Sequence, residues 1–367
     1  MAQGSPLATL VSQTKRVPVA LDAMGGDVGV SVNVAGAVES VRLDGANVIL
    51  VGDESLVRAE LEARQGAGLL DNGRVVIRHA PEVVDMDEKP GVALRKKKQS
   101  SMRVTCDLVK SGEAGAALSA GNSGAMMAVA LFVIGRIPGV MRPCIATVFP
   151  SRHPSGMSLL LDAGANVDCT PEHLVQFAIM ADVYTRQQFG EESPSLGLIA
   201  NGSEETKGTD LTRAAFRLLS QTDLNFVGYI ESNCLSRGEP RIAVTDGFTG
   251  NIILKTAEGA QQFVTQQLKA GYVHGGILAK LGGLLSKPMF NALKEKFDPR
   301  EYGAAPLLGL SAPAYIAHGK SDAFAIRRAV TLASQCSPDL LTKKISENIS
   351  KWSSLLEKER EPDGVAS

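Results

Sequence analysis

Short apolar runs alternate with longer amphipathic stretches through the first 245 residues of the chain. The apolar runs predict strands over residues 17–21, 47–52, 74–78, 114–118, 144–149, 157–161, 196–200, 225–230 and 242–245. The stretches between them predict helices over residues 31–43, 101–111, 124–135 and 209–219, and one that opens at Thr170–Pro171. Ser31 and Thr170 suit the N-cap position of a helix, and Pro171 suits its first turn. Because strands and helices alternate, we expect a largely parallel sheet covered by helices on both faces.

The last third of the chain has a different pattern. A long helix is predicted from Asn251 to about residue 270, and residues 275–297 then interleave apolar residues with lysines such as Lys280 and Lys287 around Gly and Pro. Apolar residues at this spacing are typical of a core or dimer face, whereas the lysines also suit a hairpin lying on a membrane surface. Residues 306–318 predict two strands, and two helices close the chain. We therefore expect a disordered extension (1–16), an α/β domain (17–337) with a helical projection (251–300), and a C-terminal helix with a mobile tail (338–367).

Four of the predicted strands end in loops of small and polar residues. These loops span residues 22–27, 119–125, 162–168 and 245–251, and each precedes a helix. Glycine lets such a loop turn tightly or approach a ligand, and the first N–H groups of the helix have no partner within it. If the loops meet at the carboxyl edge of one parallel sheet, they form a pocket suited to phosphate or an oxyanion. The pattern predicts an enzyme that handles a small anion.

Composition narrows the class of protein. The chain has 367 residues, 44% of them hydrophobic, enough for one large α/β domain or two lobes. Its 38 Lys and Arg residues balance 39 Asp and Glu residues, and aromatic residues make up 5%, so we expect no nucleic-acid partner. The five Cys and five His residues lack metal-ligand or disulfide spacing, which predicts no metal and reduced thiols. With no signal peptide or membrane-spanning run evident, we expect a cytoplasmic protein, and attachment to a membrane surface remains open.

Together, the loops resemble those of a known family. Asp22-Ala-Met-Gly-Gly-Asp27, Ser119-Ala-Gly-Asn-Ser-Gly-Ala125, Gly164-Ala-Asn-Val-Asp168 and Asp246-Gly-Phe-Thr-Gly-Asn251 are similar, in this order, to the bacterial phosphate acyltransferases of phospholipid synthesis. The similarity runs from about Val17 to Ser337. The chain departs from the family at Val30, near a position that is often Pro. It also departs at Ala200-Asn201, where the family usually has Asn followed by a hydrophobic residue.

The resemblance implies both a fold and an activity. It implies a Rossmann-like, three-layer α/β/α fold related to dehydrogenases, a homodimer, and peripheral membrane association through a helical projection. The family transfers a fatty acyl group from acyl carrier protein to inorganic phosphate, without a cofactor, and so forms acyl phosphate. The further partner it implies is the downstream glycerol-3-phosphate acyltransferase.

This reaction makes modest chemical demands. Phosphate, with a second pKa of about 6 like that of a phosphate ester, is largely dianionic at neutral pH. The leaving thiolate, whose thiol has a pKa of about 8.5 if it behaves like free Cys, departs without a strong acid. The enzyme must therefore hold the reactants together and stabilise a tetrahedral oxyanion with N–H groups and a cation.

The candidate residues follow from this need. The catalytic candidates are Lys207, His318 and Asn122. The substrate-binding candidates are Asp22, Gly25, Gly26, Asp27, Gly121, Ser123, Gly124, Asn166, Asp168, Asp246, Gly247, Thr249, Gly250 and Asn251. A dense basic run, Arg95, Lys96, Lys97 and Lys98, is the candidate docking surface for the acidic carrier protein, and a solvated face is its alternative.

Several candidates also have structural explanations. Lys207 precedes Gly208 and can place a compact charge on phosphate, but a solvated lysine is common. The Asp22 and Asp27 carboxylates would repel phosphate, so capping a helix or positioning a cation suits them better. His318 suits either a proton shuttle or a supporting hydrogen bond. Asn166 and Asp168 suit either the pocket or a helix cap.

Two other functions remain as alternatives. One is a related dehydrogenase or an acetyl-phosphate-forming transferase on a similar scaffold, although no G-x-G-x-x-G motif stands in the chain. The other is a non-catalytic scaffold that binds an acyl carrier or a membrane. Phosphate-dependent release of thiol from acyl carrier protein would separate all three.

Overall fold

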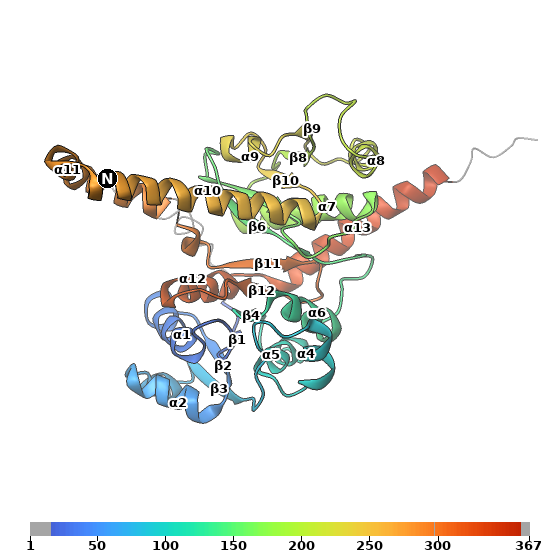
Figure 1. Ribbon diagram of the computed structural model, residues 1–367. Coiled ribbons are helices and arrows are strands. Elements are labelled where there is room, and N and C mark those ends of the chain that lie inside the picture. The colour runs from blue at the N-terminus through green and yellow to red at the C-terminus, as the bar shows by residue number, and fades with distance from the viewer. Residues whose placement is uncertain (1–15, 297, 361–367) are drawn as a thin grey trace, which may run out of the picture.

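The computed structural model describes residues 16–296 and 298–360. Its strands form two sheets, rather than the one sheet expected (Figure 1). The first sheet has the order β3-β2-β1-β4-β12-β11-β5. Its strands are β1 (Val19–Asp22), β2 (Val48–Gly52), β3 (Val75–His79), β4 (Ala116–Ser119), β5 (Cys144–Ile145), β11 (Ala304–Leu308) and β12 (Ala314–Ala317).

The second sheet has five strands in the order β6-β7-β10-β8-β9. They are β6 (Thr147–Pro150), β7 (Met157–Leu161), β8 (Leu196–Ile199), β9 (Phe226–Ile230) and β10 (Ile242–Val244). Within the first sheet only β11 runs against its neighbours, and within the second only β6 does so. The prediction of mostly parallel pairing is therefore confirmed for each sheet.

Helices cover both faces of the first sheet, as the apolar strands predict. One face is covered by α1 (Val30–Asp44), α2 (Glu54–Ala63) and α12 (Ala323–Ser334), with the short α3 (Ala67–Asp71) beside β3. The other face is covered by α4 (Pro90–Lys96), α5 (Ser101–Lys110) and α6 (Ser123–Val133). Side chains of β1 alternate between the two cores, since Val19 and Leu21 pack on the first face and Ala20 on the second.

The second sheet is covered less evenly. On one face it packs against α7 (Pro171–Phe189), α8 (Asp210–Leu219) and α13 (Pro338–Arg360), which share its largest core. The short α9 (Cys234–Arg237) and the first turns of α10 (Gly247–His274) cover the other face. Thr170 caps α7 and Pro171 opens it, as predicted. By contrast α1 starts at Val30 with Gly29 at its N-cap, so the prediction of Ser31 as the cap is wrong.

The predicted strand over residues 144–149 is in fact two strands. Cys144 and Ile145 pair with β11 in the first sheet, whereas Thr147 to Pro150 pair with β7 in the second. The chain crosses between the sheets at Ala146, whose N–H donates to Pro306 O at 3.1 Å. Cys144 and Leu308 of the first sheet belong to the large core beneath the second. The two sheets are thus joined by shared packing as well as by the chain.

The helical projection is present. It consists of α10, which begins at Gly247 rather than Asn251, and α11 (Ile277–Lys296), and it reaches well beyond the sheets (Figure 1). Tyr272 and Phe290 hold the pair together in an edge-to-face contact. The 3-10 turn η2 (Pro299–Glu301) follows, and β11, β12, α12 and α13 then supply the predicted two strands and two helices.

The predicted ends lie mostly outside the described residues. This holds for the disordered extension over residues 1–16, except Arg16, and for the tail beyond residue 360. The predicted C-terminal helix is α13, which ends at Arg360. Across residues 16–296 and 298–360, the helices all lack the length and apolar character needed to cross a bilayer.

Candidate functional site

Asp22 ties together the loops that follow β1 and β4. Its buried carboxylate accepts hydrogen bonds from Ser119 Oγ at 2.7 Å and from the N–H groups of Met24 and Gly25 at 3.2 and 3.1 Å. Burial raises the pKa of the Asp22 carboxyl above its ordinary value, while these hydrogen bonds oppose the rise. Asp22 therefore accepts the N–H groups of a turn, and the prediction that it caps the next helix is wrong, since Gly29 is the N-cap of α1.

The glycines of these two loops allow the chains to touch. A Cβ at Gly25 would lie 2.7 Å from Asp22 Oδ2 and 2.8 Å from Gly121 N, so a larger residue does not fit. Gly26 has φ +96° and lies against Ala120 and Gly319. The N–H of Asp27 donates to Gly319 O at 2.8 Å, which adds the end of β12 to the same cluster. The loops after β1, β4 and β12 are thus in direct contact.

Asn122 has a different role from the one expected. Its side-chain oxygen caps α6 by accepting the N–H of Ala125 at 2.9 Å. Both amide hydrogens are occupied, since Nδ2 donates to Met86 O at 2.7 Å and to Glu88 O at 3.0 Å. Asn122 therefore anchors the segment before α4 and has no side-chain donor left for a ligand. The exposed Ser123 and Gly124 occupy the first turn of α6, where N–H groups have no intrahelical acceptor.

His318 is exposed at the end of β12. Its Nδ1 accepts the N–H of Lys320 at 3.0 Å. In the neutral ring this bond leaves the proton on Nε2, which becomes a donor. The structure thus supplies a hydrogen-bond donor beside Gly319 and the loop after β1.

Asp162, which follows β7, was not among the predicted site residues. Its carboxylate accepts five hydrogen bonds at 2.6–3.3 Å, from the N–H groups of Ile145, Gly164, Ala165 and Asn166 and from Asn166 Nδ2. Burial raises the pKa of Asp162, and the same hydrogen bonds oppose the rise. An aspartate directly after an apolar run, as at Asp22, is the sequence signal that could have identified it.

The loops after β7 and β10 are also joined by hydrogen bonds. Asn166 Nδ2 donates to Pro143 O at 2.8 Å as well as to Asp162, and Asn166 O accepts the N–H of Gly247 at 2.7 Å. Asn166 therefore joins the loops after β7 and β10, while Thr170 rather than Asn166 caps α7. Asp168 is exposed on the same loop.

The start of α10 packs closely on this loop. A Cβ at Gly250 would overlap Asp162 O, and a Cβ at Gly247 would lie 2.6 Å from Asn166 O. Asp246 caps α10 by accepting both the N–H of Thr249 at 2.8 Å and its hydroxyl at 2.9 Å. Packing and capping therefore account for these four residues. Asn251 is exposed beside Gly164, at the open side of the contact.

Lys207 lies in the loop between β8 and α8. It is half-buried and has no ion-pair partner among the residues that the structure describes. Its N–H donates to Glu204 O at 2.9 Å, and the next residue, Gly208, donates to Asn201 Oδ1 at 2.8 Å. Lys207, without an ion-pair partner among the described residues, is thus held in a hydrogen-bonded loop at the carboxyl end of a parallel strand.

The carboxyl edges of the two sheets adjoin. β11 is antiparallel to both β12 and β5, so β5 runs in the same direction as β1, β4 and β12. Ile145, the last residue of β5, donates its N–H to Asp162 Oδ1 at 3.0 Å, and Asp162 follows the carboxyl end of β7. All six loops, after β1, β4, β12, β7, β10 and β8, therefore lie along two edges that meet at this bond.

Within that arrangement the loops form two groups. The first comprises the loops after β1, β4 and β12, and the second those after β7 and β10, with the Lys207 loop at the neighbouring strand β8. In the described ranges no hydrogen bond joins the groups directly, and β12 and β11 separate β4 from β5. The loops therefore lie in two groups on two sheets, and not at the carboxyl edge of one sheet as expected.

The basic run lies beside the first group. α4 packs against α6, and Pro90 of α4 contacts Gly124. Lys97 is engaged by Asp85, Glu88 and Val83 O, and its pKa is raised chiefly by its hydrogen bond to Glu88. Arg95, Lys96 and Lys98 are exposed. Three of the four predicted cations are therefore available to solvent.

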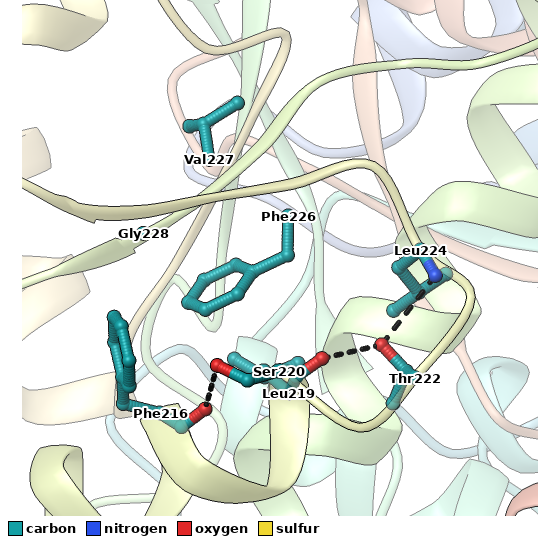
Figure 2. A pocket seen from close by; sticks show the side chains of 8 residues that line it. All are labelled: Phe216, Leu219, Ser220, Thr222, Leu224, Phe226, Val227 and Gly228. Carbon is teal, nitrogen blue, oxygen red and sulfur yellow. Dashed lines mark hydrogen bonds between the residues drawn. The ribbon is translucent and has the colours of Figure 1, made fainter.

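Two other features lie apart from these loops. Figure 2 shows a hollow lined by residues of α8 and β9, including Phe216, Phe226 and Val227, at the far strand of the second sheet. None of the predicted site residues lines this hollow. No cluster of His, Cys, Asp and Glu suited to a metal occurs in the described part of the chain.

Comparison with known proteins identifies the family. A family model described as "Fatty acid synthesis protein" matches residues 17–341. The phosphate acyltransferase of Anaeromyxobacter sp. (strain Fw109-5) is 46% identical over 94% of both chains, and that of Syntrophotalea carbinolica is 46% identical over 87% of this chain and 90% of its own.

Solved structures show the same fold at lower identity. A phosphotransacetylase from Streptococcus pyogenes matches with a TM-score of 0.59 and 18% identity, covering 91% of this chain and 99% of its own. The EutD phosphotransacetylase from Staphylococcus aureus matches with a TM-score of 0.55 and 17% identity, covering 90% and 97%. The Rossmann-like α/β fold implied by the resemblance is confirmed. On the family match and the similarity to named relatives, the chain belongs to the fatty acid synthesis protein family and is an acyltransferase.

Proposed function

We propose that the chain transfers a fatty acyl group from acyl carrier protein to inorganic phosphate, forming acyl phosphate for phospholipid synthesis. The observation that supports the proposal is that the carboxyl edges of the two sheets adjoin at the Ile145–Asp162 bond, since the exposed N-terminus of α6, Lys207 and His318 all follow strands that end at these edges. The name of the relatives, phosphate acyltransferase, supports the same reaction.

The reaction joins phosphate to the acyl carbon. A phosphate oxygen attacks the thioester carbonyl, a C–O bond forms, and the carbonyl oxygen becomes an oxyanion. When the oxyanion collapses, the C–S bond breaks and the carrier leaves as a thiolate, which then takes a proton from water. Neither partner needs strong acid or base, because phosphate is largely dianionic near neutral pH and the thiol has a pKa of about 8.5. The site must supply orientation and positive potential.

Three groups suit these tasks. The ammonium of Lys207 would bind phosphate as a compact charge. The N–H groups of Ser123 and Gly124, at the positive end of α6, would bind phosphate or the oxyanion. His318 Nε2–H would donate to the oxyanion, since its Nδ1 already accepts from Lys320. Asp22, Asp162 and Asn166 would support the loops without touching phosphate.

The acyl carrier protein would dock on the exposed cations of α4 and the residues after it. Arg95, Lys96 and Lys98 are free to meet an acidic partner, and α4 lies against the helix whose first turn we assign to the anion. Such a basic rim speeds encounter at low salt. Lys97 would contribute less, since its charge is already paired.

The helical projection would serve the dimer and the membrane. Large apolar side chains of α10 and α11 are exposed, among them Phe263, Leu278 and Leu285 at 62%, 84% and 73%. Lysines interleave with them, which suits contact with anionic lipid headgroups. We therefore propose a cytoplasmic homodimer attached peripherally to the membrane, close to the glycerol-3-phosphate acyltransferase that would use its product.

The test is thiol release from acyl carrier protein carrying a fatty acid. Release should depend on added phosphate and should produce acyl phosphate in equal amount. A protein that releases no thiol, but reduces a nicotinamide cofactor with a hydroxy acid, would be a dehydrogenase. A protein that binds the carrier and shows neither activity would be a scaffold.

A further inference from the structure

A side-chain hydrogen bond of Asn201 joins the two ends of the loop between β8 and α8. Asn201 Oδ1, just after β8, accepts the N–H of Gly208 at 2.8 Å across the loop. On the other side of the same residue, Arg213 Nη1 of α8 donates to Gly208 O at 2.5 Å. Gly208 is therefore held through both its N–H and its carbonyl group, and Lys207 is the residue directly before it.

Gly208 also has no room for a side chain. Its φ is +88°, and a Cβ there would overlap Thr212 Oγ1 and lie 3.2 Å from the hydroxyl oxygen of Tyr229. On the other arm of the loop, a Cβ at Gly202 would lie 2.9 Å from Lys207 Cγ. The alkyl stem of Lys207 therefore rests against Gly202 while the next peptide is clamped.

We propose that Asn201 is a positioning residue, which directs the Lys207 ammonium toward phosphate by holding the Gly208 peptide. The inference rests on the role proposed above for Lys207. Asn201 itself does not touch the reactants, and it is exposed, so it adds little to the core. The Asn201–Gly208 bond closes a seven-residue span, and without it the loop would sample more conformations. Lys207 would then meet phosphate in the right place less often.

The experiment compares Asn201→Ala with Ser203→Ala, an exposed residue of the same loop with no side-chain bond among those the structure describes. Asn201→Ala should raise KM for phosphate roughly fivefold, the equivalent of one hydrogen bond. KM for the acylated carrier and the melting temperature should stay unchanged. Hydrogen exchange at the Gly208 amide should become faster. Ser203→Ala should leave all four quantities at the wild-type value.

The outcomes separate the inference from the proposed function. An unchanged KM for phosphate, an equal rise in both KM values, or unchanged exchange at Gly208 would each overturn the role of Asn201. Wild-type protein without phosphate-dependent thiol release would instead overturn the function. If release occurs but Lys207→Ala keeps full activity, the function stands, and the roles of Lys207 and Asn201 both fall.

Discussion

Asp22 and Asp162 occupy equivalent places in the two sheets. Each stands in a Leu-Asp-Ala sequence at the end of a buried strand, and each accepts the N–H groups of the residues two and three positions later. Each also accepts a bond from a second strand: Asp22 from Ser119 Oγ of the paired strand β4, and Asp162 from the Ile145 N–H of β5 in the other sheet. The same short motif therefore shapes the loop in both halves of the candidate site.

The buried Asp22 predicts a pH dependence of stability. Its pKa is raised in the folded protein by burial, so the native state binds this proton more tightly than the unfolded chain does. The contribution of Asp22 to stability should therefore be greatest below about pH 4, the unfolded value, and should be lost as pH rises through the folded pKa. The free energy of unfolding of wild type minus that of Asp22→Asn, from urea titrations, should fall over this window. A difference that rises with pH would contradict the prediction.

Lys207 gives the sharpest prediction for activity. Lys207→Ala removes the charge proposed to bind phosphate, so acyl-phosphate formation should be abolished. The melting temperature should remain that of wild type, because Lys207 forms no ion pair with the described residues. Lys110→Ala, at the exposed end of α5 remote from the loops, is the matched control and should keep full activity. Normal turnover in Lys207→Ala would remove this residue from the mechanism.

At the scale of elements, α10 has two different parts. Its first turn is packed onto the loop after β7, where Gly247 and Gly250 are the helix's buried residues. Ile253 in the second turn packs on the core of the second sheet, and later turns of α10 extend beyond the sheets, where α11 packs against them. The capped start fixes the direction of the helix, and the exposed remainder is available for partners.

Two glycines of α10 form a matched test of this division. Gly250→Ala should destabilise the protein by about 1–3 kcal/mol, because its Cβ would overlap Asp162 O. Gly259→Ala, where nothing lies within 4 Å of the added Cβ, should stabilise by up to about 1 kcal/mol through helix propensity. Chemical denaturation measures both. Equal effects of the two substitutions would show that the start of α10 is not packed as described.

At the scale of the whole molecule, we propose separate tasks for the apolar projection and the two-sheet body. The body carries the loops, and the projection exposes large apolar side chains that the described residues leave uncovered. An exposed apolar surface of this kind on a globular protein marks a contact with a partner or a membrane. The proposed division places chemistry and attachment on different parts of the molecule.

Reversing the charge of the projection tests attachment. Lys280→Glu with Lys287→Glu should weaken binding to vesicles of anionic phospholipid, since each lysine near such a surface contributes about 1 kcal/mol. Binding is measured by co-sedimentation. The control, Lys110→Glu with Lys344→Glu, changes the net charge equally on other helices and should bind as wild type does. Equal loss in both variants would indicate that net charge, rather than the projection, controls binding.

Much of the local structure could be predicted from sequence because its causes are local. The apolar run over 157–161 matches β7 without error, and Thr170-Pro171 carries its own cap and start signal for α7. The loops over residues 22–27, 119–125, 162–168 and 245–251 are predicted from their own residues. The roles of Asn122 and Asp162 could not be predicted in this way. The bonds of Asn122 to Met86 and Glu88, and that of Asp162 to Ile145, join residues far apart in sequence.

The sequence by itself determined the alternation of strands and helices, the parallel pairing, and which strands end in short loops with glycine, since spacing, caps and glycine act over a few residues. Only the tertiary structure decided that the chain passes from one sheet to the other at Ala146. It also decided that Gly250 meets Asp162, and that the carboxyl edges adjoin at Ile145. These contacts depend on which distant surfaces pack together. A continuous apolar run such as residues 144–149 does not show which strand each of its residues pairs with.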